Sequence, residues 1–263
     1  MANQEDREAR LYPFHLAFNK DNLAWFPFMM DGAAVSPAGK AIGCGISSRA
    51  AGSMSLRDPQ GRANRRRLYA ALGREEARFF TCMQVHSRKA LVLGPESPAE
   101  GPEADGMISQ DREACLLITV ADCLPVYLYD TQSGAFALVH SGWKGTGIAL
   151  TALKLMNEGW STRPKAVAAV LGPCIGPCCY AVEPTRSRNF EAEFGGETGA
   201  FPLGSVVKEN ALDLQAANAR LLVNAGVRHI AVCKDCTCTD ERLGSFRREG
   251  VAYTAMAAWA GYF

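Results

Sequence analysis

Short apolar runs rich in β-branched residues recur along the chain and predict buried β-strands. Such runs occupy residues 116–120 (LLITV), 126–129 (VYLY) and 135–139 (AFALV). The last two are joined by DTQSG, a turn sequence that predicts a connection between neighbouring strands. Further strands are expected at residues 40–46, 90–93, 165–171 and 227–232, and a strand end at 79–86.

Helical periodicity appears between these strands. It predicts helices at residues 62–73, at 148–158 with Gly159 at the end, and at 213–224 with Asp213 as N-cap and Gly226 beyond the end. Hairpins mixed with helical crossovers predict an α+β fold, in which mixed β-sheets pack together with helices outside.

The chain shows no internal repeat and no long linker, so its 263 residues are expected to form one domain, 1–263. The segment 94–106 (GPESPAEGPEADG) is rich in Pro, Gly and Glu and is interpreted as a surface loop.

Charge and composition exclude several classes of protein. Apolar residues make up 48% of the chain and the net charge is +1, which is ordinary for a globular protein. The densest basic run is Arg62, Arg65, Arg66 and Arg67, and it is interpreted as the solvated face of a helix. Without a strongly basic surface, a nucleic-acid partner is not expected.

The N-terminal MANQEDREARLYPF lacks the pattern of a signal peptide, and no apolar run is long enough for a transmembrane helix. We therefore expect a cytoplasmic protein without a membrane partner. Ten cysteines in such a chain favour reduced thiols over a disulfide framework, and some of those thiols could bind metal.

Three short segments carry metal-ligand side chains where a strand gives way to a loop. They are MQVHS with His86, TVADCLPVYLYD with Cys123, and LVHSGWKGTG with His140. Two imidazoles and one thiolate match a catalytic zinc site, which has three protein ligands and an open fourth position. The three residues are too far apart in sequence for a finger-like knuckle, so they would converge only through the tertiary structure.

The residues alone also permit a structural interpretation. Only four histidines are present, and a histidine at a strand end often serves as a hydrogen-bonded structural residue. A buried cysteine often fills space without reacting. From residue types and positions alone, both interpretations stay open.

The three segments together resemble the YfiH-like family, also called laccase-domain proteins, multicopper polyphenol oxidases, peptidoglycan editing factors and purine nucleoside phosphorylases. The family pattern is QVHG, then TADC followed by a strand with proline, then HAGWRG. This chain has QVHS at 84–87, VADC at 120–123 and HSGWKG at 140–145, in which Lys144 keeps the positive charge.

The resemblance extends from about residue 40 to about residue 255. GISSRAAGSMSL is similar to a degraded form of the family's STR-x-GG segment, and ANRRRLYAALG is similar to the helix that follows. LGPCIGPCCYAVEP resembles the family's GP-x-I-G-x-x-x-Y-x-V, and SFRREG its terminal SYRR-x-G. These make seven matches in the family's order.

The resemblance implies zinc bound by His86, Cys123 and His140, which would be catalytic. It also implies activity on purine nucleosides with phosphate: phosphorolysis of adenosine, inosine and methylthioadenosine, with deamination of adenosine as a side activity. The partners would be these small molecules. The oligomeric state is left open between monomer and homodimer.

Four other residues are candidates for substrate contacts. Arg49 matches the family's STR arginine and could hold phosphate or developing charge, or form an ordinary ion pair. Asp122 could orient a ligand, accept a proton or cap its loop. Lys144 is a further candidate for substrate binding, and Arg247 could also bind an anion. Gly142, Gly145 and Gly147 resemble a phosphate cradle at a helix start.

Six cysteines form two late groups, Cys174/Cys178/Cys179 and Cys233/Cys236/Cys238. CKDCTC contains C-x-x-C, a common zinc half-site, and the earlier group could supply the other half. Packing thiols without a second metal are the alternative, and redox reactivity is a third.

Two rival functions belong to other classes of enzyme. Copper-dependent phenol oxidation, with copper in place of zinc, agrees with one family name but needs more imidazoles than four histidines provide. A peptidoglycan-precursor-editing hydrolase would use Cys123 as a nucleophile activated by histidine. A non-catalytic protein that keeps metal only for folding is a further alternative.

Overall fold

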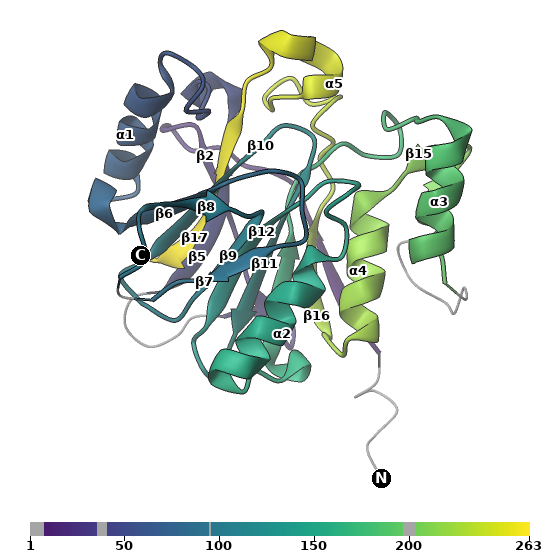
Figure 1. Ribbon diagram of the computed structural model, residues 1–263, viewed down its shortest axis with the longest axis horizontal. Helices are drawn as coiled ribbons and strands as arrows, with labels where there is room; N and C mark the ends of the chain where they lie inside the picture. Colours follow the sequence, from purple (N-terminus) through teal and green to yellow (C-terminus); the bar gives the residue numbers. More distant parts are fainter. Residues whose placement is uncertain (1–7, 36–40, 95, 197–203) are drawn as a thin grey trace.

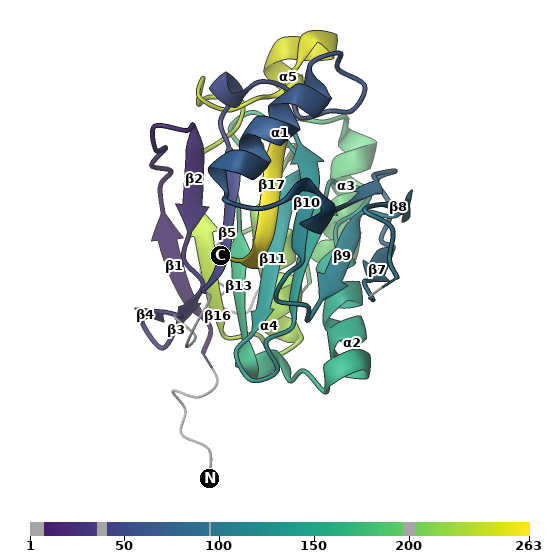
Figure 2. The same ribbon diagram turned by 90° about the vertical axis from the view of Figure 1, so that its left-hand side faces the viewer.

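The computed structural model describes residues 8–35, 41–94, 96–196 and 204–263. Two mixed β-sheets pack face to face, and helices cover their outer faces (Figures 1 and 2). The predicted α+β architecture, with packed mixed sheets and helices outside, is therefore confirmed.

The larger sheet has seven strands and is packed on both faces by apolar clusters. Its order is β1 (Arg10–Phe14), β16 (His229–Cys233), β13 (Val167–Leu171), β11 (Leu124–Asp130), β12 (Phe136–Ser141), β9 (Gly106–Ser109) and β7 (Ala90–Val92). Strands β1, β16 and β13 run parallel, and the hairpin β11–β12 runs antiparallel beside them. The predicted DTQSG hairpin is thus present.

The smaller sheet has six strands. Its order is β2 (Leu23–Phe26), β5 (Ile42–Ser47), β17 (Met256–Tyr262), β10 (Cys115–Val120), β6 (Phe79–Met83) and β8 (Glu100–Glu103). Two short ribbons complete the strands, β3 (Met29–Met30) with β4 (Ala33–Ala34), and β14 (Val207–Lys208) with β15 (Ala211–Leu212).

Alternation along the strands explains the layers, because successive side chains in a strand point to opposite faces. In β11, Val126 packs in the cluster beneath the helices, while Tyr127 packs between the two sheets. In β10, Leu116 packs between the sheets and Leu117 packs toward the helix on the other side. Strands buried on both faces read as continuous apolar runs, which is the pattern seen in the sequence.

The helices are α1 (Gly61–Ala71), α2 (Ile148–Trp160), α3 (Pro184–Phe194), α4 (Leu214–Asn224) and the short α5 (Phe246–Glu249), with 3-10 turns η2 (Arg49–Ala51), η3 (Glu76–Arg78), η4 (Pro164–Ala166) and η5 (Gly250–Ala252). Helix α1 covers the six-stranded sheet, while α2 and α4 cover the seven-stranded one. Asp213 caps α4 as predicted, since its carboxylate accepts from the backbone N–H of Ala216 at 2.8 Å.

Three expectations were wrong in part. Gly159 lies inside α2, which ends at Trp160 and has Ser161 as its C-cap with φ of 54°. The segment 94–106 is not simply a surface loop, because it contains β8 and the buried Asp105. Arg65 is not on a solvated face: it is buried, and its Nε donates to the carbonyl of Met54.

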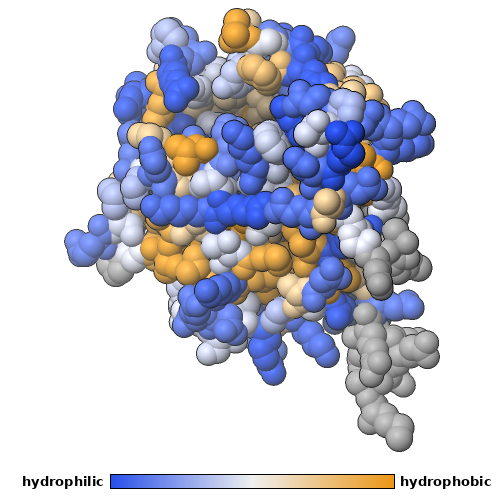
Figure 3. Space-filling model, turned by 45° about the vertical axis from the view of Figure 1, so that its right-hand side comes forward, coloured by the Kyte–Doolittle hydropathy of each residue, from blue (hydrophilic) through white to orange (hydrophobic). Residues whose placement is uncertain are grey.

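The surface agrees with the balanced charge of the chain. On the face drawn in Figure 3, hydrophilic residues form most of the surface and hydrophobic residues gather in patches between them. None of the helices in the described ranges offers the length and apolar character that a bilayer crossing requires.

Candidate metal centre

Two of the three predicted ligands lie where the chain crosses from one sheet to the other. His86 lies between β6 of the six-stranded sheet and β7 of the seven-stranded sheet. Cys123 lies between β10 and β11, which also belong to different sheets. His140 is on β12, beside β11 in the hairpin. The packing of the sheets therefore brings together residues that are distant in sequence.

The three side chains form a compact group. One nitrogen from each histidine and the sulfur of Cys123 lie within 4.8 Å of one another. The two imidazole rings have centroids 5.0 Å apart and meet at an angle of 71°. His140 is buried, Cys123 is half-buried and His86 is exposed, so the group is fixed on one side and open to solvent on the other.

A buried carboxylate, Asp105, supports this group from behind. It accepts hydrogen bonds from the backbone N–H groups of Val85, His86 and Ser87 at 3.2, 3.0 and 2.6 Å. It also accepts from the Ser87 hydroxyl at 2.8 Å and pairs with Nδ1 of His140 at 2.9 Å. Asp105 thus shapes the turn that carries His86 and holds the ring of His140.

The contact with Asp105 determines which nitrogen of His140 faces the site. Burial alone would raise the pKa of Asp105, but its hydrogen bonds with His140 and Ser87 outweigh burial and lower the pKa to about 2. The ionised carboxylate only accepts, so Nδ1 of His140 donates and Nε2 is directed toward Cys123. An outer carboxylate holding a histidine in this way is typical of metal-binding imidazoles.

Cys123 is placed to ionise. Burial would raise the pKa of its thiol, but the charges and hydrogen bonds of His140 and His86 lower that pKa to about 6. Burial would likewise lower the pKa of His140, but Cys123 and Asp105 raise it to about 9. The structure therefore favours the thiolate, which is the form that binds metal.

Gly142 keeps the space beside Cys123 free. A Cβ added to Gly142 would lie 2.8 Å from the sulfur of Cys123 and 3.5 Å from the ring of His86. A Cβ on Gly145 would lie 3.0 Å from the carbonyl oxygen of Ser87. At these two positions the glycines of SGWKGTG allow close packing against the ligand segments.

Asp122 anchors the loop that carries Cys123. Its backbone has φ of 88°, which is unusual for a residue other than glycine. Its carboxylate accepts from the Thr237 hydroxyl and from the backbone N–H of Arg247, both at 2.6 Å. Its carbonyl accepts from the N–H of Ile175 at 2.9 Å. Asp122 thus connects the Cys123 loop to two later segments.

Arg49 lies at a different surface feature. Its Nε pairs with a carboxylate oxygen of Glu249 at 3.6 Å. It borders a cavity of about 460 Å³ that Phe18, Asn22, Ser48, Ala50, Glu241 and Arg242 also line.

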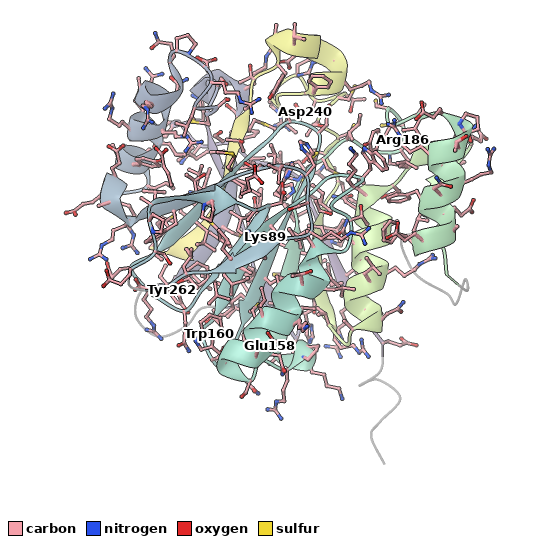
Figure 4. All side chains as sticks on the ribbon, viewed as in Figure 1. Lys89, Glu158, Trp160, Arg186, Asp240 and Tyr262 are labelled. Carbon is pink, nitrogen blue, oxygen red and sulfur yellow. The ribbon has the colours of Figure 1, made fainter. Side chains whose placement is uncertain are left out.

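Lys144 and Arg247 each lie over an aromatic ring, Trp143 and Tyr180 respectively. Lys144 is exposed, with Nζ 5.5 Å from the ring centroid of Trp143, and Arg186 lies 4.7 Å over the same ring. The guanidinium of Arg247 donates to the carbonyls of Cys179 and Ala181 and lies 5.5 Å over Tyr180. Figure 4 shows Arg186 at the end of the molecule that also carries Asp240, opposite Glu158 and Trp160 of α2.

Sequence reasoning missed Asp105, Trp143, Tyr180 and Arg186. Asp105 stands in a segment whose Pro, Gly and Glu residues indicate a loop. The one signal nearby is the apolar run GMIS, which directly follows Asp105 and forms β9. Trp143 and Tyr180 stand within the recognised motifs. Their contacts with Arg186 and Arg247 depend on the tertiary structure and could not be read from the motifs.

The residues present fit zinc. One thiolate and two imidazoles form a borderline-soft donor set, one face is open, and a carboxylate orients His140. A soft, partly open ligand group between two packed β-sheets defines a candidate metalloenzyme of the α+β class.

Residues 50–261 match the family model described as multi-copper polyphenol oxidoreductase laccase, and the chain belongs to this laccase-domain, YfiH-like family. The resemblance seen in the motifs is thereby confirmed.

The chain is also similar to two proteins named as purine nucleoside phosphorylases. The chain is 33% identical, over 199 residues, to a purine nucleoside phosphorylase of Corynebacterium glutamicum, covering 73% of this chain and 78% of the relative. It is 32% identical over 211 residues to the purine nucleoside phosphorylase YlmD of Geobacillus stearothermophilus, covering 75% and 77%.

Solved structures agree with the fold. The crystal structure of YlmD from Geobacillus stearothermophilus aligns with a TM-score of 0.80 and 26% identity over 94% of this chain and 98% of that chain. The structure of the hypothetical protein YfiH from Bacillus licheniformis aligns with a TM-score of 0.75 and 23% identity, covering 84% and 93%.

Proposed function

We propose that this chain is a zinc-dependent purine nucleoside phosphorylase that acts on adenosine, inosine and methylthioadenosine, with adenosine deaminase as a side activity. The observation that carries the proposal is the His86–Cys123–His140 group with Asp105 behind it. The phosphorylase activity for which relatives above 30% identity are named supports the choice of reaction.

The ligand group would hold the metal, which when bound supplies a Lewis acid able to polarise an oxygen or acidify a water. Asp105 keeps Nδ1 of His140 protonated and the ring in place. Cys123 supplies negative charge, and exposed His86 leaves the approach open. Gly142 keeps side-chain atoms away from the sulfur, so a substrate can come close.

Phosphorolysis joins a phosphate oxygen to the anomeric carbon while the bond to the base nitrogen breaks. The base leaves with the bonding electrons and takes up a proton. Such a reaction depends on holding phosphate and nucleoside in line. We assign phosphate binding to Arg49, because a guanidinium suits phosphate oxygens and because its partner Glu249 lies on α5 together with Arg247, whose N–H donates to Asp122 beside Cys123. Lys144 and Arg247 would contact the nucleoside side, and Asp122 would position both Cys123 and Arg247.

The test is product analysis by mass spectrometry. Purified protein of measured zinc content is incubated with adenosine and phosphate. Adenine together with ribose 1-phosphate reports phosphorolysis, and inosine reports deamination. If neither product forms with the zinc-loaded protein, the proposed function is wrong.

A matched pair of histidine variants tests the site itself. His86→Ala should lose metal and adenosine turnover, because one of only three ligands is removed. His15→Ala should keep both, because His15 is exposed and pairs with Asp235. Turnover that survives in metal-free His86→Ala would show that the reaction takes place elsewhere.

The copper oxidase alternative agrees with the description of the family model. Two of the four histidines are occupied elsewhere, which argues against a multicopper centre. His15 pairs with Asp235, and His229 pairs with Tyr12 and Asp31. Only His86 and His140 belong to the ligand group, which is fewer imidazoles than a multicopper centre needs. Phenol oxidation by copper-loaded protein, without nucleoside turnover, would favour the alternative.

A peptidoglycan-editing hydrolase would use Cys123 as a free nucleophile, and its lowered pKa suits that role. Zinc that protects Cys123 from alkylation would exclude it. All ten cysteines lie in the described ranges and are free thiols, which supports the inferred cytoplasmic location.

A further inference from the structure

A second group of ligand side chains lies on two loops beyond the ends of neighbouring strands. Strands β13 and β16 are parallel partners, so the loops that follow them emerge at the same edge of the sheet. The first loop carries Cys178 and Cys179, and the second carries Cys236. The three sulfur atoms lie within 4.8 Å of one another.

We propose that Cys178, Cys179 and Cys236 bind a second, thiophilic d10 cation, and that this ion is zinc(II). The sulfur of Cys178 lies 3.6 Å from the sulfurs of both Cys179 and Cys236. Sulfurs on one tetrahedral zinc are about 3.8 Å apart, since each Zn–S bond is about 2.3 Å. A disulfide would need about 2.0 Å, so the spacing fits a shared ion.

Backbone hydrogen bonds prepare one of these sulfurs for metal. The N–H of Gly176 donates to the sulfur of Cys236 at 3.2 Å. Burial would raise the pKa of Cys236, but bonds from Gly176, Thr239 and Cys238 outweigh it and lower the pKa. Burial and neighbouring thiols raise the pKa of Cys179. A divalent cation would offset part of the negative charge of thiolates held this close together.

Cys238 provides a fourth sulfur next to the group. It follows Cys236 by two positions on the same loop, and its thiol is among the groups that raise the pKa of Cys179. With Cys238, the site would reach the four-sulfur set of a closed structural zinc site. Cys178 is exposed, so an ion can enter from solvent.

The second site is connected to the first through one side chain. Thr237, between Cys236 and Cys238, donates from its hydroxyl to Asp122, which precedes Cys123. The N–H of Thr237 also donates to the carbonyl of Cys174 at 3.0 Å. An ion here would hold the Thr237 segment in place, so its role would be to position the loop of the first site.

Metal content of the full chain is the first test. Protein is reduced, loaded with zinc, desalted and analysed by plasma mass spectrometry together with its variants. One ion at each of the two groups predicts about two zinc per wild-type chain. Cys178→Ser and Cys236→Ser should each fall to about one zinc, and Cys123→Ser to about one by loss of the other ion. The control Cys82→Ala, in neither group, should keep both.

Alkylation of wild-type protein makes the result independent of variant folding. Zinc should protect Cys178, Cys179 and Cys236 from iodoacetamide when the labelled peptides are mapped, and a chelator should expose them. A single zinc per wild-type chain with these three cysteines labelled would overturn the proposal. So would a Cys178–Cys236 disulfide that forms in place of zinc binding. Neither outcome bears on nucleoside turnover, which tests the first site separately.

Discussion

The two cysteine-containing groups are built on different parts of the same fold. The His86–Cys123–His140 group stands at crossings between the sheets and has a fully buried carboxylate behind it. The Cys178–Cys179–Cys236 group stands on loops beyond strand ends, and a backbone N–H supports its sulfur. One mixes nitrogen with sulfur and keeps an open side, while the other is sulfur alone.

This difference indicates a division of roles. In the first group a carboxylate sets the orientation and basicity of an imidazole ligand, and the open coordination position admits substrate. A site of sulfurs on adjoining loops mainly fixes those loops. Substitutions around the first group should therefore change its metal affinity and nucleoside turnover while zinc stays bound at the second group.

Loss of the sulfur of the first group should have the largest effect. Cys123→Ser removes the anionic ligand, so nucleoside turnover should fall more than the about 100-fold that loss of an outer partner can cost. Zinc bound at the second group should remain. Steady-state kinetics and metal analysis measure both quantities. If Cys123→Ser lost both ions together, the groups would not be independent.

Replacement of the buried carboxylate should have the next largest effect. In Asp105→Asn one oxygen becomes an NH₂ group, which faces either the donors of Ser87 or the donors of His86 and His140. Metal affinity of the first group should fall about 10- to 100-fold. Competition with a chelator measures it.

The control Asp111→Asn changes an exposed carboxylate that accepts only from Glu113 N–H, and should leave affinity unchanged. Equal metal affinity of Asp105→Asn and wild type would contradict the assigned role of Asp105.

Crowding of Cys123 should have a smaller effect. In Gly142→Ala the new methyl carbon would lie 2.8 Å from the sulfur, so the ligand must shift. Such overpacking lowers the free energy of unfolding by about 1–3 kcal/mol. Denaturant unfolding and zinc affinity measure the change. Gly159→Ala is the matched control, because its position is in α2 with no atom within 4 Å of an added Cβ.

The smallest effect is expected at the rim. Lys144→Ala removes an exposed ammonium from the proposed substrate rim, where a solvent-screened charge contact is worth up to about 1 kcal/mol. The KM for phosphate or nucleoside should therefore rise about two- to fivefold, with kcat changed less. Lys154→Ala, an exposed lysine of α2 paired with Glu158, should leave both unchanged. A fall in kcat alone would show that Lys144 acts in the transition state.

Much of the central architecture could be predicted from the sequence. The apolar runs at β10, β11, β12 and β13, and the helices α1, α2 and α4, are strong local patterns because both faces or one whole stripe are buried. The predictions overlooked β17, whose MAAWAGY lies between β5 and β10 in the sheet. Small residues dominate this strand, so its sequence lacks the β-branched signal.

The support for the candidate site could not be predicted in the same way. Metal-ligand residue types can be recognised from sequence. Asp105, however, accepts from the backbone N–H groups of three residues, and such groups are present whatever the side chains are. Arg65 shows the same limit, because its burial depends on the carbonyl of Met54 in another segment. Tertiary hydrogen bonds of this kind leave no periodic pattern.

The position of His86 and Cys123 at the two crossings between sheets has a thermodynamic consequence. An ion held there spans the boundary between the layers, so separation of the sheets must also disrupt its coordination. The free energy of metal binding and the free energy of packing the two sheets together are then linked. Tighter binding of the ion stabilises the packed sheets, and tighter packing of the sheets raises the affinity for the ion. The apolar layer around Tyr127 contributes no ligand to the ion. A mutation in this layer would nevertheless increase the rate at which the ion dissociates.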